Sequence, residues 1–255
     1  MTSSSRARQE RERAFYRSAA AGLEPERMPP GALHEFDLSV TERLGDLAGR
    51  RVLEVGCGSG DVTLELVRRG AEVTALDLSP DLLAVARARM ERFRPDARAT
   101  FVCAPLEETG LEPSAFDLVA GKWILHHTDL RRSAPEVARL LRPGGRAVFF
   151  ENQALNPLLR FARRRLLDVP GVVRVGTRDE RPLDEEDFAY LRELFDSVEL
   201  AYPNFYFFEA LGRQLLRYRG HSFLQRADRT VWRRLPRLRP YSYHVVLELR
   251  KAAAA

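Results

Sequence analysis

Residues 52–60, VLEVGCGSG, place an acid and three alternating glycines at the end of an apolar run. Glycines between a strand and a helix let a ligand approach the backbone, and the start of the helix offers it free N–H groups. The glycines here are Gly56, Gly58 and Gly60, a G-x-G-x-G spacing followed by Asp61. A dinucleotide-binding loop has the spacing G-x-G-x-x-G, and Asp61 would stand where its pyrophosphate rests. The loop therefore disfavours NAD.

A second acid, Asp77, follows 17 residues after Gly60 in the stretch ALDLSPDLL. A carboxylate at the end of a strand accepts two hydroxyl hydrogen bonds in a fixed geometry. The alternative role is to cap the helix that follows, but Ser79, directly before Pro80, already suits that position. We therefore favour ligand binding for Asp77.

Three further ionisable residues follow expected strand ends. His126 and His127 come just after the apolar stretch FDLVAGK, and Glu151 ends the stretch RAVFFE. A histidine there is a candidate general base near neutral pH, and Glu151 is a candidate base or substrate contact. The alternatives are packing histidines and a structural carboxylate. No spacing suggests a third ligand, so we expect no metal.

The elements that must position these residues alternate along the chain. Apolar runs predict strands at 51–56, 71–78, 99–104, 115–122 and 146–152, with helices at 61–70, 79–93 and 133–145 between them. A helix and a strand follow at 186–202, an alternating strand at 242–250, and two helices precede the series at 10–22 and 34–47. This order predicts an α/β fold with a doubly wound, mostly parallel sheet.

Four of these stretches together resemble a known family. They are EVGCGSG, ALDLSPDLL, FDLVAGKWILHH and LLRPGGRAVFFE, and they occur in the family's order over residues 40–151. The sequence is similar to class I S-adenosylmethionine-dependent methyltransferases. The resemblance implies a Rossmann-like, seven-stranded sheet with an antiparallel C-terminal strand, and S-adenosyl-L-methionine as cofactor.

The resemblance also implies roles for residues around the methionine and ribose of the cofactor. Glu54 should orient the loop and the methionine amino group, with Gly56, Cys57, Gly58 and Gly60 forming the loop that passes the methionine. Asp77 should hold the ribose. Gly121 and Lys122 fall where the family's backbone contacts the amino-acid end.

The adenine end follows the family less closely. Leu78 should pack on the ring, and Leu106 should offer it a backbone N–H. The family often has an acid after the third strand, but the aligned residue in CAPLEE is Pro105.

Charge is concentrated near the C-terminus. The net charge is +5, and all 41 basic residues except Lys122 and Lys251 are arginine, which indicates a coding bias more than a polyanionic partner. Residues 204–241 alone carry a charge of +7, interleaved with aromatic residues. We interpret 204–240 as a helical lid inserted into a core formed by 34–202 and 241–251, with 1–33 as an arm and cap helix.

These features favour methyl transfer to a small apolar or aromatic acceptor in specialised metabolism. An acceptor that also carries an acidic group is compatible with them. The alternatives are a nucleic-acid methyltransferase, favoured by the basic segment, and a protein that binds the cofactor without transferring methyl, such as a cyclase. We expect no nucleic-acid partner, because no reading module is present. Two cysteines and no apolar run of membrane length predict a cytoplasmic protein, and a homo-oligomer is compatible with the sequence.

Overall fold

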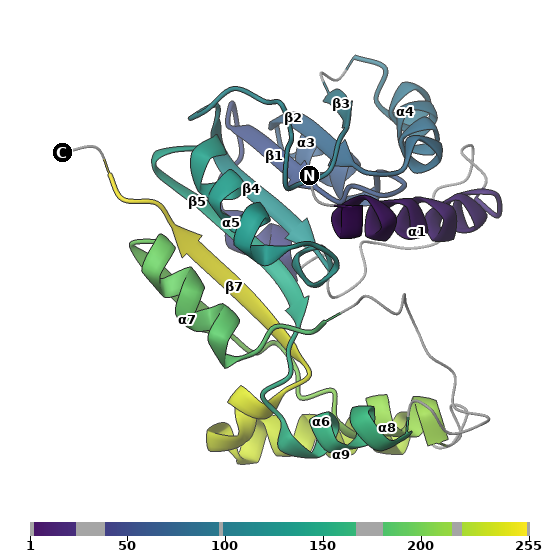
Figure 1. The fold of residues 1–255 in the computed structure, drawn as a ribbon, viewed down its shortest axis with the longest axis vertical. Helices are drawn as coiled ribbons and strands as arrows, with labels where there is room; N and C mark the ends of the chain where they lie inside the picture. Colours follow the sequence, from purple (N-terminus) through teal and green to yellow (C-terminus); the bar gives the residue numbers. More distant parts are fainter. Residues whose placement is uncertain (1–2, 24–38, 97–98, 167–180, 216–220, 254–255) are drawn as a thin grey trace.

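The computed structural model describes residues 3–23, 39–96, 99–166, 181–215 and 221–253 (Figure 1). Within them, seven strands form one sheet in the order β3-β2-β1-β4-β5-β7-β6. The strands are β1 (Arg51–Val55), β2 (Glu72–Asp77), β3 (Ala99–Cys103), β4 (Phe116–Lys122), β5 (Leu141–Asn152), β6 (Ser197–Ala201) and β7 (His244–Arg250).

The first five strands are mutually parallel, and β7 runs antiparallel to both of its neighbours, β5 and β6. The strand order reverses between β1 and β4, so the carboxyl ends of these strands open a crevice where ligands bind in open α/β sheets. The predicted fold class, a mostly parallel Rossmann-like sheet with an antiparallel C-terminal strand, is confirmed.

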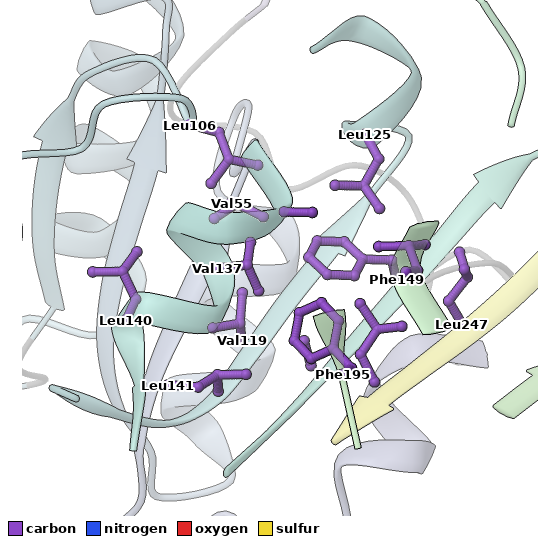
Figure 2. Close-up of a cluster of buried hydrophobic side chains, with 14 of the residues drawn as sticks. Val55, Leu106, Val119, Leu125, Val137, Leu140, Leu141, Phe149, Phe195 and Leu247 are labelled. Atoms are coloured by element: carbon purple, nitrogen blue, oxygen red, sulfur yellow. The ribbon is translucent and has the colours of Figure 1, made fainter. Parts of the chain in front are cut away.

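Helices cover both faces of the sheet. The helices of the core are α1 (Ser3–Ala20), η1 (Glu42–Leu44), α3 (Asp61–Arg68), α4 (Pro80–Phe93), η2 (Leu125–His127), α5 (Leu130–Leu140) and α7 (Glu185–Leu194). One buried cluster joins the sheet to α5 and α7, with Val119, Val137 and Phe149 at its centre (Figure 2). A second cluster joins the opposite face to α3, α4 and residues 40–47. The strands are apolar on both faces because both faces are covered.

Some predicted boundaries were wrong. The helix expected at 133–145 is α5, which begins after the N-cap Asp129 and ends at Leu140. The stretch RPGG belongs to β5 instead, since the residue before Pro143 disfavours helical geometry and the strand pairs with β4 from Leu141. The N-terminal helix begins at Ser3, earlier than expected. Part of the helix expected at 34–47 lies outside the described residues.

A group of helices lies beyond the sheet, at one end of the molecule's longest axis (Figure 1). It contains α6 (Pro157–Leu166), α8 (Phe208–Leu215), α9 (His221–Arg234) and the short helix η3 (Pro236–Tyr241). The helical character expected between 204 and 240 is present in the described residues. The helix α6 was not among the elements expected from the sequence, because its arginines hide the apolar spacing.

Candidate functional site

The glycine loop follows β1 and has a backbone that only glycine adopts easily. Gly56, Gly58 and Gly60 have φ angles of 70°, 52° and 85°. A Cβ at Gly60 would lie 2.9 Å from Cβ of Ala86, whereas a Cβ at Gly58 would have no atom within 4 Å. Gly60 therefore serves helix packing, and Gly58 leaves open space beside the backbone.

The end of β2 holds this loop in place. The Leu76 carbonyl accepts the N–H groups of Gly56 and Cys57 at 2.8 and 3.1 Å. The Asp77 carboxylate accepts the N–H of Gly58 and that of Ser79, each at 2.8 Å. Burial raises the pKa of Asp77, and these hydrogen bonds oppose the increase.

Glu54 lies in the same region, at the centre of β1. Its side chain is buried, and the Thr63 hydroxyl donates to Oε2 at 2.5 Å. Burial raises the Glu54 pKa to about 8, against the effect of this hydrogen bond. Burial also raises the pKa of the Cys57 thiol, which is therefore protonated and unsuited to act as a nucleophile.

A cavity of about 200 Å³ opens beside these residues. Its lining comes from residue 40, β1, the glycine loop, the start of α3 and the end of β4: Val40, Glu54, Val55, Gly56, Cys57, Gly58, Ser59, Asp61, Val62, Ala120, Gly121 and Lys122. Glu54 and Ala120 are register partners, so the carboxylate of β1 and the end of β4 share one face of the sheet. The predicted methionine-side residues thus line one cavity, with the exception of Gly60.

Gly121 is required by packing rather than by its backbone angle. A Cβ there would lie 2.8 Å from both Phe149 and Val55 side-chain atoms. Lys122, next in the chain, is half-buried, and its Nζ lies 5.0 Å from the Trp123 ring centroid.

Helix α1 crosses the ends of β2 and β4. The Arg13 Nε donates to the Leu78 carbonyl at 3.3 Å, and Arg8 pairs with Glu107. Leu78 is half-buried, while the Leu106 side chain is buried in the core, so the predicted adenine contact of Leu106 depends on its backbone alone.

The two predicted histidines lie side by side, with ring centroids 4.4 Å apart. His126 Nδ1 is 2.6 Å from Oε2 of Glu151, and His127 Nδ1 is 3.1 Å from Oε1 of Glu12 on α1. The other oxygen of Glu151 accepts the N–H groups of residues 124 and 125 at 2.9 and 2.7 Å. Glu151 is fully buried, and hydrogen bonds within the protein occupy both of its carboxylate oxygens.

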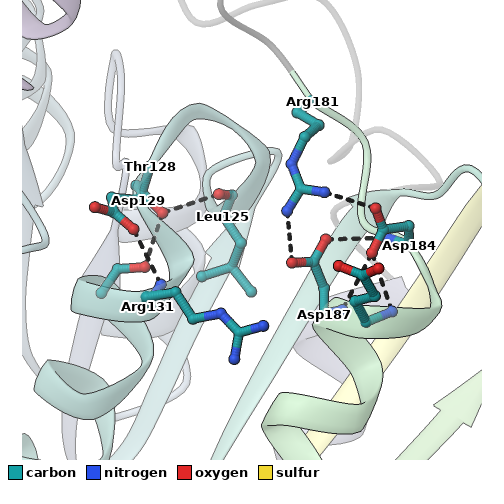
Figure 3. A network of polar contacts seen from close by, with 9 residues as sticks. Leu125, Thr128, Asp129, Arg131, Arg181, Asp184 and Asp187 are labelled. Atoms are coloured by element: carbon teal, nitrogen blue, oxygen red, sulfur yellow. Dashed lines mark hydrogen bonds and ion pairs between the residues drawn. The ribbon is translucent and has the colours of Figure 1, made fainter. Parts of the chain in front are cut away.

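A polar network supports the loop that carries the histidines (Figure 3). Thr128 donates its hydroxyl to the Leu125 carbonyl at 2.9 Å, and the Arg181 N–H donates to the His126 carbonyl at 3.2 Å. The Arg181 guanidinium pairs with Asp184 and Asp187 at the start of α7, each at 2.6 Å. Arg181 therefore links the loop that carries the histidines to the start of α7, a connection that sequence spacing did not predict.

Aromatic rings continue from Lys122 along the carboxyl edge of the sheet. The Trp123 ring lies 5.8 Å from Phe150 and 6.4 Å from His244, and Tyr206 stacks on His244 at 4.5 Å. Lys122 and Phe150 are register partners, so this aromatic row lies on the face of the sheet that carries the cavity. Burial lowers the His244 pKa to about 3, which keeps the ring neutral. Sequence spacing could not bring these four rings together, because they come from separate segments.

The described residues contain no group of three or more histidine, cysteine or acidic side chains arranged to hold a metal ion. Nor does any described helix have the length and apolar character needed to cross a membrane.

Comparisons with known proteins match this site region. A family model described as a methyltransferase domain matches residues 52–145. An uncharacterized methyltransferase of Mycobacterium tuberculosis is 46% identical over 101 residues, covering 39% of this chain and 38% of the relative. A ubiquinone biosynthesis O-methyltransferase of Cronobacter sakazakii is 32% identical over 164 residues, covering 57% of this chain and 66% of the relative. The chain thus matches between about two fifths and two thirds of these relatives' length.

Solved structures share the fold over nearly the whole chain. Geranyl diphosphate C-methyltransferase from Streptomyces coelicolor superposes with a TM-score of 0.63 at 14% identity, covering 97% of this chain and 98% of that one. The cyclase SpnF superposes with a TM-score of 0.60 at 19% identity, covering 94% and 93%. The glycine loop and the acid that ends β2 both lie within residues 52–145, the region that the methyltransferase-domain model matches. Residues 52–145 therefore form a methyltransferase domain of the class I S-adenosylmethionine-dependent kind.

Proposed function

We propose that this chain transfers the methyl group of S-adenosylmethionine to a small apolar or aromatic molecule. The observation that carries the proposal is the pair of buried acids, Glu54 and Asp77, on adjacent strands around the glycine loop. In this proposal Glu54 and the loop hold the methionine end, and Asp77 holds the ribose. Leu78 and Leu106 contact the adenine, and the backbone of Gly121 and Lys122 contacts the amino-acid end.

The chemistry of the cavity fits that cofactor. A buried carboxylate with a pKa of about 8 is poorly compensated within the protein, so a cation in the cavity would stabilise its ionised form. The ammonium of the methionine moiety is such a cation. The open space at Gly58 lets a ligand approach the loop backbone.

The aromatic row supports an acceptor with a planar or apolar body. Trp123, Tyr206 and His244 lie on the cavity face of the sheet, and none of the three rings is charged at neutral pH. Relatives named for ubiquinone and geranyl diphosphate support an apolar acceptor class. The arginines of residues 204–240 suit an acceptor that also bears a carboxylate or phosphate.

The cofactor, when bound, supplies a methyl group on a positively charged sulfur, and that sulfur leaves readily as a neutral thioether. The protein then contributes mainly by holding the acceptor in line and excluding water. An acceptor hydroxyl also needs to lose its proton. The Glu151 carboxylate accepts Nδ1–H of His126, so Nε2 of the neutral ring carries the lone pair for a base. His127, held by Glu12, is the second candidate base, and Glu151 acts as a positioning residue.

A transfer assay tests this function. The chain is incubated with methyl-labelled S-adenosylmethionine and panels of phenols, prenyl phosphates and RNA, and label in each product is counted. Label in a phenol or prenyl compound is the expected result. Label in RNA alone would support the nucleic-acid alternative, and cofactor binding with no labelled product in any panel would support a cyclase-like protein.

A further inference from the structure

The helices beyond the sheet expose large apolar side chains together with arginines. Eight large apolar side chains are exposed among the described residues, and six of them lie on α6, α9 and η3 or on the one residue between α9 and η3. We call these six the lid apolar set: Leu158, Phe161, Phe223, Leu235, Leu238 and Tyr241. Leu158, Phe161 and Phe223 are 65%, 64% and 69% exposed, which is unusual for side chains of this size.

The three elements are joined to one another. Asn156, at the start of α6, donates to the Tyr241 carbonyl at 2.9 Å, and Gln153 donates to the Pro240 carbonyl at 3.1 Å. Arg239, also on η3, donates to the carbonyl of Trp232 on α9 at 2.9 Å and covers its ring. The lid apolar set therefore belongs to a single structural unit.

Exposed arginines lie on the same helices as this set. The sequence of α6 contains four arginines, that of α9 four and that of η3 two, against the single acid Asp228. Asp228 is buried and accepts three backbone N–H groups at the start of α8, so it does not face solvent. On α9, Phe223, Arg226 and Arg233 are exposed at positions that share one side of the helix.

We propose that this surface binds the headgroup region of an anionic lipid membrane. Exposed leucine and phenylalanine flanked by arginine is the composition of a helix that lies in the membrane interface. The arginines favour anionic headgroups, and the apolar side chains gain by entering the acyl boundary. Three of the six apolar residues are leucines, which cannot stack on bases, so a lipid fits better than a nucleic acid. A second copy of the chain fits this surface less well, because docking it there would bring the arginines of the two chains together.

Vesicle co-sedimentation of the full chain tests the proposal. We expect binding to vesicles of phosphatidylcholine mixed with phosphatidylglycerol, and little binding to phosphatidylcholine alone. The double variant Leu158→Ser with Phe161→Ser should bind about tenfold more weakly. Arg226→Gln and Arg233→Gln should each weaken binding about fivefold.

Matched controls come from α4, where Phe93→Ser and Arg92→Gln remove an exposed phenylalanine and an exposed arginine away from these helices. They should bind vesicles as the unsubstituted chain does, and all variants should keep its melting temperature. No binding to anionic vesicles, or equal losses in lid and control variants, would overturn the proposal. So would a dimer that the lid variants dissociate, or RNA binding without vesicle binding. Cofactor affinity is measured in parallel, so the result does not depend on the proposed function.

Discussion

Burial raises the pKa of both Glu54 and Asp77, but the two carboxylates have different partners. Asp77 accepts two backbone N–H groups, whereas the hydrogen bond to Glu54 comes from the Thr63 hydroxyl. Sequence predicted both acids, since each lies in a contiguous motif. It could not predict that Glu12 meets His127, because 115 positions separate the two residues and only the docking of α1 brings them together.

Glu54 should make stability depend on pH. Its pKa is about 8 in the folded chain and 4.5 when unfolded, so the folded state binds the proton more tightly. The protonated Glu54 side chain therefore gives its full contribution to the free energy of unfolding below pH 4.5. This contribution is lost between pH 4.5 and about 8, by roughly 1.4 kcal/mol per pH unit. Glu54→Gln should remove this slope, which urea unfolding of both chains between pH 5 and about 9 measures. A stability difference between the chains that does not change with pH would contradict the assignment.

Substitutions in the loop that carries the histidines should lower turnover and leave cofactor binding unchanged. His126→Asn should lower kcat about 100-fold and leave cofactor affinity unchanged, since the ring acts on the acceptor alone. Glu151→Gln should lower kcat similarly, because an amide N–H would turn the lone pair of His126 toward Nδ1. His127→Asn is the matched comparison, and kcat and Kd are measured for all three. Full turnover in both histidine variants would mean that positioning alone drives transfer.

At the scale of elements, the sequence predicted the strands of the sheet more accurately than the helix ends. Strands buried on both faces are continuous apolar runs, and the glycines mark the turn after β1. The end of α5 was misplaced because Gly144 and Gly145, which resemble a helix stop, lie within the span of β5, between its first pair with β4 at Leu141 and the pairs that begin at Arg146. Strand pairing, a tertiary interaction, decided that boundary.

Two glycines of the loop should respond differently to the same substitution. Gly60→Ala should lower the free energy of unfolding by about 2–3 kcal/mol, since φ is positive and the new methyl meets Ala86 at 2.9 Å. Gly58→Ala should cost about 1 kcal/mol from backbone strain, yet weaken cofactor binding more, because its methyl enters open space beside the loop. Chemical unfolding and calorimetry check both. Equal losses of stability and of affinity in the two variants would refute this division of roles.

At the scale of the molecule, the sequence predicted the order of elements and a basic, aromatic helical segment near the C-terminus. It did not predict that α6 lies in the same region as η3, because hydrogen bonds from Gln153 and Asn156 to residues 240–242 make that link. The aromatic row was missed for the same reason. Its rings come from the residue after β4, from β5, from residue 206 and from β7, and only the strand order brings them together.

The helices beyond the sheet should unfold separately from it. Asp228 accepts the N–H groups of Phe207, Phe208 and Glu209, so Asp228→Ala leaves three donors at the start of α8 unsatisfied. Hydrogen exchange should accelerate at least tenfold in α8 and α9 and stay unchanged in β1, β4 and β5. Uniform acceleration across the sheet would show instead that the molecule unfolds as one unit.

The central claim is that the acids beside the glycine loop hold S-adenosylmethionine, and calorimetric titration of that cofactor into the chain and into Asp77→Asn tests it most directly. Asparagine keeps one oxygen to accept a loop N–H but loses the charge that strengthens hydrogen bonds to the ribose hydroxyls. The account predicts micromolar binding by the unsubstituted chain, binding about 30–100-fold weaker in the folded variant, and no binding of NAD. Equal affinity of the two folded chains for S-adenosylmethionine would contradict it.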